Sequence, residues 1–377
     1  MSNRRWSQLR EYLAEILQDY LSQPDDPAQN PAPRFLIDLM PANGNLGEGL
    51  LARGVMPNVR RYLDAAALVD APGVGVQIQY PLFDEGMVGA LAEDFIEFYC
   101  DVAHEIRQRG LVFYAETSPL FSGTRFSDVP VSYAGMSPES YVQQRAKMAQ
   151  IIIEQIKPDY LSFVHEVSTE RILTGLDVTD AMLVTALAEL SFWSGAETKV
   201  GGGLPAWADG KPDWMGEPVE LRELMRRYAQ AGDFYNAHFY PAQTALSPRS
   251  NSELYQLQWM LGSLPPGTEI VVGETWLYKA MAWELAGGDP MARADKIYAR
   301  DAFEFWDDLD ALFLQAIHRL ARVAGIRYIN LFWSRHLFAY QTEGRTVDEK
   351  ALNRKVMDAI AAGALTRTGE MCRQLNG

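Results

Sequence analysis

Cysteine is scarce in this chain, where only Cys100 and Cys372 occur among 377 residues, far apart and in no CxxC pattern. This spacing suggests neither a zinc site nor a disulfide framework. No run of 18 apolar residues occurs, and no secretory signal follows the basic start. We therefore predict no membrane segment. Localisation stays open: cytoplasmic as the chain stands, or extracellular if a leader has been removed.

Basic residues are outnumbered, with 34 Lys and Arg against 49 Asp and Glu, which gives a net charge of -15 and a pI of about 4.9. Such a charge repels phosphate backbones and anionic lipid headgroups. We therefore expect no nucleic-acid partner and no membrane partner. Hydrophobic residues make up 48% of the chain, enough for a large core. Nothing in the composition indicates an oligomeric state.

The first 33 residues differ from the rest of the chain. Residues 6–22 carry apolar side chains at helical spacing and predict an amphipathic helix. The stretch "QPDDPAQNPAP" that follows is polar and rich in proline, so it predicts a linker. We expect a main domain over residues 34–377.

Short apolar runs alternate with longer stretches of helical periodicity through this main domain. Eight apolar runs occur, at 34–40, 73–80, 111–116, 160–166, 198–203, 234–240, 269–274 and 327–333. The helical stretches are 58–70, 88–109, 138–156, 179–191, 217–231, 252–261, 301–323 and 347–361. Continuous hydrophobic strands separated by helices indicate parallel pairing with both faces covered.

Eight such units in about 340 residues predict a closed (β/α)₈ TIM barrel. The alternative is an open, doubly wound sheet. It is less favoured because the stretch after the first run, "DLMPANGNLGEG", is not the strand–GxGxxG–helix unit of dinucleotide-binding folds.

Polar side chains stand where the apolar runs end. In a TIM barrel the reactive groups lie at the C-terminal ends of the strands. Three of these residues are glutamates, and a buried carboxylate needs a partner or a function. Any one of the three could simply form an ion pair or cap a helix. The residues are Asp38, Gln79, Glu116, His165, Glu166, His238, Tyr240, Glu274, Asn330, Trp333 and Ser334.

The barrel sequence resembles the clan A glycoside hydrolases, the retaining (β/α)₈ glycosidases that include family 5. These enzymes place an acid/base glutamate at the end of strand four and a nucleophilic glutamate at the end of strand seven. Glu166 in "SFVHE" and Glu274 in "VVGETW" match these positions. His238 and Tyr240 match a His-x-Tyr pattern of strand six, and Trp333 matches an aromatic residue that ends strand eight.

Two features depart from the family pattern. The family normally has asparagine before the acid/base glutamate, where it helps to hold the sugar's 2-hydroxyl, whereas this chain has His165. Histidine can also donate a hydrogen bond. In addition, no arginine ends strand one or two, where several relatives place one near the nucleophile.

The resemblance implies the roles of the two glutamates. Retaining enzymes use one carboxylic acid and one nucleophilic carboxylate about 5–5.5 Å apart. Glu274 would be the ionised nucleophile, supported by a hydrogen bond from Tyr240. Glu166 would be the acid, and we expect burial beside Phe163 and repulsion from Glu274 to raise its pKa.

Sugar rings stack on aromatic side chains, while polar neighbours bind their hydroxyls. We expect Trp333 at the cleaved bond, with Trp276 and Tyr80 extending the platform. Trp207 and Trp214 are further candidates, although ordinary packing explains them slightly better. The other residues expected to contact substrate are His165, His238, Tyr240, Glu116 and Asp38.

The sequence thus predicts a retaining glycoside hydrolase of β-linked oligo- or polysaccharides that uses no cofactor or metal. One alternative is a metal-dependent isomerase or hydrolase on the same barrel, because Glu116, Glu166, His238 and Glu274 offer metal-ligand atoms. HxH, HExxH and DxD spacings are absent, and the neighbouring aromatic residues suit a sugar better. Another alternative is a barrel that binds carbohydrate or a protein without turnover.

Overall fold

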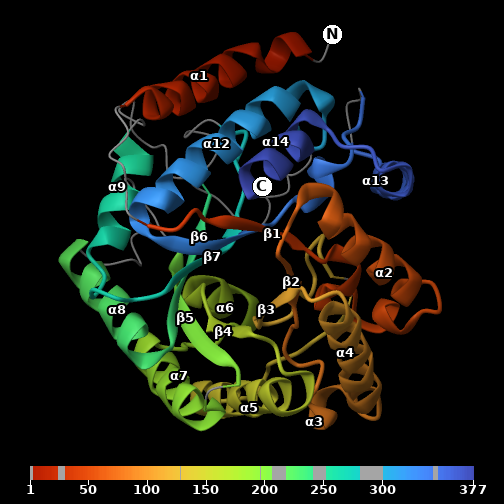
Figure 1. The fold of residues 1–377 in the computed structure, drawn as a ribbon. Helices are drawn as coiled ribbons and strands as arrows, with labels where there is room; N and C mark the ends of the chain where they lie inside the picture. The colour runs from red at the N-terminus through yellow and green to blue at the C-terminus, as the bar shows by residue number, and fades with distance from the viewer. Residues whose placement is uncertain are drawn as a thin grey trace.

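The computed structural model describes residues 3–23, 30–127, 129–195, 197–205, 218–240, 252–280, 300–342 and 347–377. Eight parallel strands form a closed barrel in sequence order, and β1 closes it by pairing with β8 (Figure 1). This confirms the predicted (β/α)₈ fold. The strands are β1 (Arg34–Asp38), β2 (Gly73–Gln77), β3 (Val112–Glu116), β4 (Tyr160–Val164), β5 (Lys199–Pro205), β6 (Phe234–Phe239), β7 (Ile270–Thr275) and β8 (Ile326–Leu331).

Helices surround the barrel in Figure 1. They are α1 (Asn3–Ser22), α2 (Val55–Ala66), α3 (Glu85–Val88), α4 (Leu91–Gln108), α5 (Pro138–Ile151), α6 (Val167–Thr174), α7 (Asp180–Ser194), α8 (Pro218–Ala231), α9 (Ser252–Gly262), α12 (Asp307–Ala324), α13 (Glu349–Ala362) and α14 (Arg367–Asn376). The sequence did not predict α6 or α14. Both are short and carry too few apolar residues for a clear helical period.

The glycines of β5 make room for large side chains inside the barrel. A Cβ atom added to Gly201 would overlap the ring of Phe234, and one added to Gly203 would overlap the backbone oxygen of Asn236. The run "GGG" therefore reflects close approach of β6. Phe234 belongs to an apolar cluster that fills the barrel below its C-terminal mouth, together with Leu36, Tyr114, Tyr160 and Val271.

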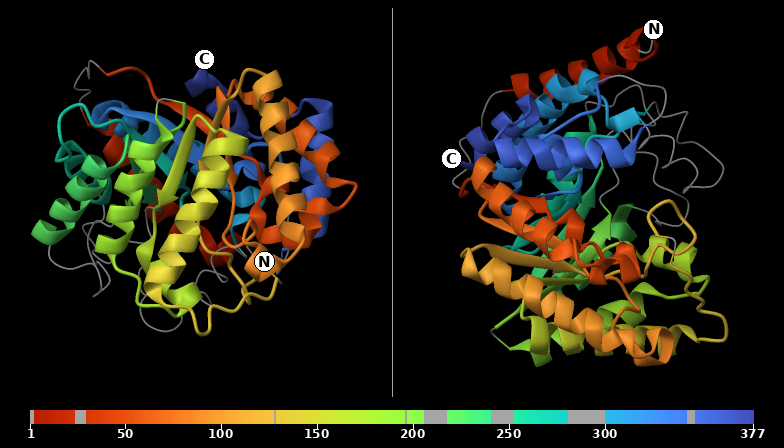
Figure 2. Two further views of the ribbon diagram at one scale, coloured as in Figure 1. Left: turned by 90° about the horizontal axis from the view of Figure 1, so that it is seen from below. Right: turned by 90° about the vertical axis from the view of Figure 1, so that its right-hand side faces the viewer.

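The N-terminal helix α1 packs along α12 on the outside of the barrel (Figures 1 and 2). Its buried side chains are those of the predicted apolar face, including Leu9, Leu13, Leu17 and Tyr20. Burial of this face against the barrel's own helix layer explains why the segment is amphipathic. In the part of the chain that the structure describes, no helix combines the length and the apolar character needed to cross a membrane.

Candidate active site

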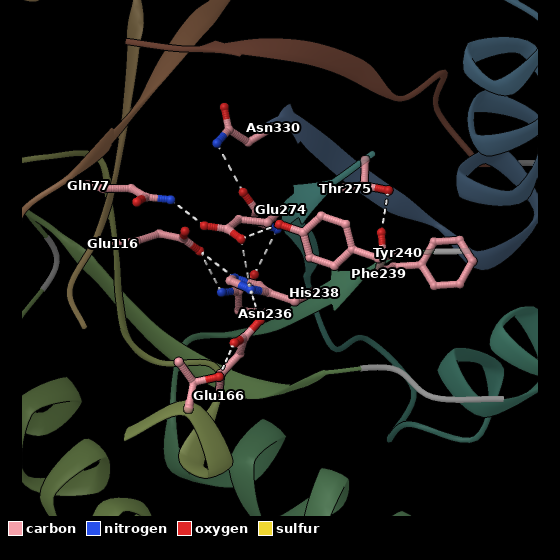
Figure 3. Close-up of polar contacts among 12 residues, drawn as sticks. Gln77, Glu116, Glu166, Asn236, His238, Phe239, Tyr240, Glu274, Thr275 and Asn330 are labelled. Atoms are coloured by element: carbon pink, nitrogen blue, oxygen red, sulfur yellow. Dashed lines mark hydrogen bonds and ion pairs between the residues drawn. The ribbon is translucent and has the colours of Figure 1, made fainter. Parts of the chain in front are cut away.

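The two predicted catalytic glutamates meet at the mouth of the barrel (Figure 3). Glu166 lies between β4 and α6, and Glu274 lies near the end of β7. One carboxylate oxygen of each, and a ring nitrogen of His238, all lie within 4.8 Å of one another. This separation suits two carboxyl groups that act on one sugar carbon, because retaining glycosidases hold theirs about 5–5.5 Å apart.

Glu274 receives hydrogen bonds at both carboxylate oxygens. The Gln77 side-chain amide donates to Oε1, and the Tyr240 hydroxyl donates to Oε2, as the sequence predicted for Tyr240 (Figure 3). Gln77 ends β2, one of the two strands whose ends lack an arginine in this sequence. The strand-end pattern indicated Gln79 instead, but the Gln79 side chain donates to Gln77 Oε1 at 3.2 Å. The side chain that meets Glu274 from β2 is thus a neutral amide rather than a cation.

Glu166 is the more exposed of the pair, with 24% of its side chain open to solvent against 11% for Glu274. The Thr169 hydroxyl donates to its Oε2 atom at 2.5 Å, and His238 Nδ1 lies 3.1 Å from its Oε1 atom. Thr169 lies in the first turn of α6, a helix that the sequence did not predict. Its contact with Glu166 therefore had no signal in the apolar pattern.

His238 joins three carboxylates. Its Nε2 atom lies 3.0 Å from Glu116 Oε1, and its Nδ1 atom lies 3.1 Å from Glu166 and 3.5 Å from Glu274 Oε2. The ring of His165 stacks on it with a centroid separation of 4.2 Å and an interplanar angle of 17°. Because each ring nitrogen faces a carboxylate oxygen, these contacts suit a ring in which both nitrogens donate, which is the imidazolium form.

The pKa shifts agree with this assignment. Burial lowers the pKa of His238, but the charges of Glu116 and Glu274 and the hydrogen bonds of Glu116 and Glu166 raise it well above 6.5. For His165, burial and the neighbouring charge of His238 lower the pKa to about 4, which keeps this ring neutral. The stacked pair therefore consists of one charged ring and one neutral ring.

The pKa values of the two glutamates reverse the expected order. Burial raises the pKa of Glu274 to about 8. The charges of Glu116 and Glu166 add to the effect of burial, and together these causes outweigh the lowering effect of the His238 charge. Burial also acts to raise the pKa of Glu166, but the hydrogen bond and charge of His238 bring it down to about 2. The expectation that Glu166 holds the proton in the free site is wrong, because it left out the His238 cation.

A pocket lies against Glu166 and Glu274. Its empty volume is about 310 Å³, which includes open solvent at its mouth. Among the predicted site residues, His165, Glu166 and Glu274 line it. The His165 Nδ1 atom has no hydrogen-bond partner among the described residues. Residues that the sequence did not single out form the rest of the lining: Gln77, Ser118, Pro119, Phe121, Thr169 and Glu170.

Several predicted contact residues lie away from this pocket. Trp276 and Tyr80 are fully buried, and Trp276 packs against Phe313 and His336. Neither ring offers a face to a sugar, so the prediction that they extend a platform is corrected. Packing under the loops that follow β2 and β7 explains both rings. Trp333 is 6% exposed and does not line the pocket.

Glu116 and Asp38 are also buried behind the pocket lining, at 2% and 3% exposure. The expectation that they touch substrate is therefore corrected as well. Burial, together with the charges of Glu274 and Glu116, raises the pKa of Asp38 well above its usual value. Trp207 and Trp214 lie outside the described residues.

The same side chains bear on the metal alternative. Glu116, His165 and His238 form one group whose atoms are close enough to hold an ion, and Glu166, His238 and Glu274 form another. His238 belongs to both, and both of its nitrogens already donate to carboxylates. A metal ion would have to displace those hydrogen bonds, so we assign no metal ligands.

The fold and the site define a (β/α)₈ barrel with paired carboxylates from β4 and β7. No protein-family model and no curated protein matches the sequence. Among solved structures, a GH5_18 enzyme from Bifidobacterium longum superposes with a TM-score of 0.59 at 11% identity, covering 92% of this chain and 79% of that one.

Two further structures share the fold. A GH5_18 enzyme from Streptomyces cattleya in complex with GlcNAc gives a TM-score of 0.58 at 12% identity, covering 92% of this chain and 80% of that one. The exo-β-1,4-mannosidase Op5Man5 from an Opitutaceae bacterium gives 0.56 at 13% identity, covering 93% and 59%. These neighbours are glycoside hydrolases, and they confirm the predicted resemblance to the clan A barrel.

Proposed function

We propose that this protein is a retaining glycoside hydrolase that cleaves β-linked sugars by double displacement. The observation that carries the proposal is the approach of Glu166 and Glu274 to within 4.8 Å across one pocket. Two carboxyl groups at this distance can act on the same anomeric carbon, one as acid and one as nucleophile. Glu166 follows β4 and Glu274 lies near the end of β7, which supports Glu166 as acid/base and Glu274 as nucleophile through the resemblance to clan A enzymes.

In the first step Glu274 attacks the anomeric carbon while Glu166 gives its proton to the leaving oxygen. In the second step Glu166 takes a proton from water, which displaces Glu274 from the sugar. Tyr240 and Gln77 orient Glu274, and Thr169 orients Glu166. The neutral His165 ring lines the pocket, where it can contact the sugar.

The proton of the pair has to change place before the first step, because the free site holds it on Glu274. His238 Nδ1 lies between the two carboxylates, 3.1 Å from Glu166 and 3.5 Å from Glu274. It can give its proton to Glu166 and then take up the proton of Glu274 at the same nitrogen. The exchange leaves Glu166 protonated, Glu274 ionised and His238 still an imidazolium.

Hydrolysis of a panel of aryl β-glycosides, with product stereochemistry read by NMR, tests the proposal. The panel should include β-mannosides and Manβ1-4GlcNAc, because a GH5_18 enzyme of this fold has been crystallised with that disaccharide. The first-formed product is expected to retain the β configuration. Glu274→Gln should abolish turnover, and an inverted product or an active Glu274→Gln would overturn the proposal.

Chelation separates this proposal from the metal alternative. Activity should persist after dialysis against EDTA, since no step requires an ion. Loss of activity on chelation, with recovery on adding a divalent metal, would favour a metal-dependent isomerase or hydrolase instead.

A further inference from the structure

Glu116 is a third carboxylate in this site, and neither proposed catalytic step uses it. It ends β3, is 2% exposed and does not line the pocket. An ionised carboxylate buried at this depth is unfavourable unless its position is stabilised by charge and hydrogen bonds. The contacts of Glu116 therefore indicate what it does.

Three donors converge on a single oxygen of Glu116. Asn236 Nδ2 at 2.9 Å and His238 Nε2 at 3.0 Å both meet Oε1 (Figure 3). The Tyr114 hydroxyl donates to the same oxygen. Asn236 is itself fixed, since it also donates to Ser162 at 2.7 Å and accepts from the Gly273 backbone at 2.9 Å. Oε1 thus occupies a fixed place beneath the His238 ring.

The fixed carboxylate determines the state of the ring. The Nε2 atom must carry a proton to meet Glu116, and the Nδ1 atom must carry one to meet Glu166. The groups that face His238 are Glu116 from β3, Glu166 and His165 from β4, and Glu274 from β7. Asp38 of β1 lies near Glu116 and Glu274, and their charges add to burial in raising its pKa. Within the described residues, the charges facing His238 are thus negative.

We propose that Glu116 is a positioning residue that holds His238 as an imidazolium in the free site, where its Nδ1–H serves both proposed catalytic glutamates. Once the proton has moved from Glu274 to Glu166, and before the first step, the negative charge lies on Glu274. After it, Glu274 is a neutral ester and Glu166 is a carboxylate. Nδ1 lies 3.1 Å from one and 3.5 Å from the other, so the cation stays beside the negative charge wherever it resides.

The charge state of His238 can be tested without any substrate. The chain has only five histidines, so their ring nitrogens can be resolved by ¹⁵N–¹H NMR, with His238→Gln to assign the signal. In the wild type, the His238 ring should keep both protons from pH 6 to pH 9. A ring that is neutral at pH 7 in the wild type would overturn the proposal, whatever the variants do.

Glu116→Gln isolates the charge, because the amide oxygen can still accept all three hydrogen bonds. The amide NH₂ then takes the place of Oε2, which has no partner among the described residues. In this variant His238 should lose its second proton within the same pH range. A ring that stays doubly protonated in Glu116→Gln would show that Glu116 is not what holds the charge.

Glu269→Gln is a matched control at the opposite end of the barrel. Glu269 also accepts from a tyrosine, at 2.7 Å from the Tyr160 hydroxyl, but it precedes β7 rather than ending a strand at the mouth. The His238 signal should be unchanged in this variant. A shift as large as that of Glu116→Gln would mean that the ring responds to any loss of barrel charge, which contradicts the proposal.

The part of the proposal in which the His238 cation stabilises the negative charge on Glu274 and then on Glu166 rests on the proposed glycosidase mechanism. It has its own readout. Glu116→Gln should lower kcat/KM at least tenfold for sugar leaving groups, equivalent to about 1.4 kcal/mol of barrier. It should have less effect on a dinitrophenyl leaving group, which departs without a proton from Glu166. Equal losses on both would refute this role, while the NMR result would still report the state of His238.

Discussion

Replacing Glu274 with glutamine is expected to stabilise the folded protein at alkaline pH while it abolishes activity. The Glu274 carboxyl is buried beside two other carboxylates, and its pKa is raised from 4.5 to about 8. A group whose pKa is raised on folding contributes its stability below the unfolded pKa and loses it as the pH rises through the folded pKa. The wild type should therefore lose stability between about pH 4.5 and pH 8. Glutamine does not titrate and avoids this loss.

The size of the effect follows from the shift. Each pKa unit corresponds to about 1.4 kcal/mol, so ionising Glu274 in the folded state costs on the order of 5 kcal/mol. For 377 residues, at about 2.1 cal/mol/K per residue, this equals roughly 6 °C in Tm. The amide should keep its hydrogen bonds, since the Tyr240 hydroxyl can accept as well as donate.

Thermal unfolding of both proteins across pH 4.5 to 9, followed by circular dichroism, measures the difference. The Tm advantage of Glu274→Gln should be near zero at the acid end and grow until about pH 8. Glu269→Gln provides a control of opposite sign: its pKa is lowered because hydrogen bonds from Lys199 and Tyr160 outweigh burial. That variant should lose stability relative to the wild type above about pH 4.5. A Tm difference for Glu274→Gln that does not vary with pH would refute the reasoning.

Three other substitutions test neighbouring parts of the structure. Thr169→Val removes a donor from Glu166, so the pKa of Glu166 should rise and the acid limb of the kcat/KM profile should move to higher pH; an unmoved limb would contradict the contact. Arg145→Met leaves buried Glu170 without its cation and should cost about 3–5 kcal/mol in urea unfolding, and a cost below 1 kcal/mol would contradict a buried pair. Trp276→Ala should cost about 3–5 kcal/mol but leave KM unchanged, whereas a raised KM would restore its predicted contact with sugar.

The barrel could be predicted from the sequence because its strands are largely buried on both faces and read as apolar runs, although β8 exposes Arg327. The strand-end rule then placed Glu166 and Glu274 among eleven candidates, and the resemblance to clan A glycosidases singled out these two. The expectation of a stacking platform failed for Tyr80 and Trp276, since an aromatic residue just past a strand can pack under the loops as readily as it can face a ligand. Apolar periodicity carries no information on this choice.

The charge balance of the site could not be predicted, because it depends on which side chains meet in space. Glu116 ends β3 and Glu166 follows β4, 50 residues later in the chain, yet both contact the same His238 ring. That ring reverses the pKa order expected for the glutamates. Gln77 was missed for a similar reason: two glutamines lie near the end of β2, and only the register of the strand determines which of them reaches Glu274.

The tie between Asn376 and β1 bears on how the chain folds during synthesis. The Asn376 side chain accepts from the Phe35 amide at 2.7 Å and donates to the Phe35 and Val69 carbonyls, joining residues 341 positions apart. The barrel also closes only when β1 pairs with β8. During synthesis, β1 therefore cannot pair with β8 or contact Asn376 until nearly all of this sequence has left the ribosome. Until then the partly synthesised barrel has unpaired strand edges.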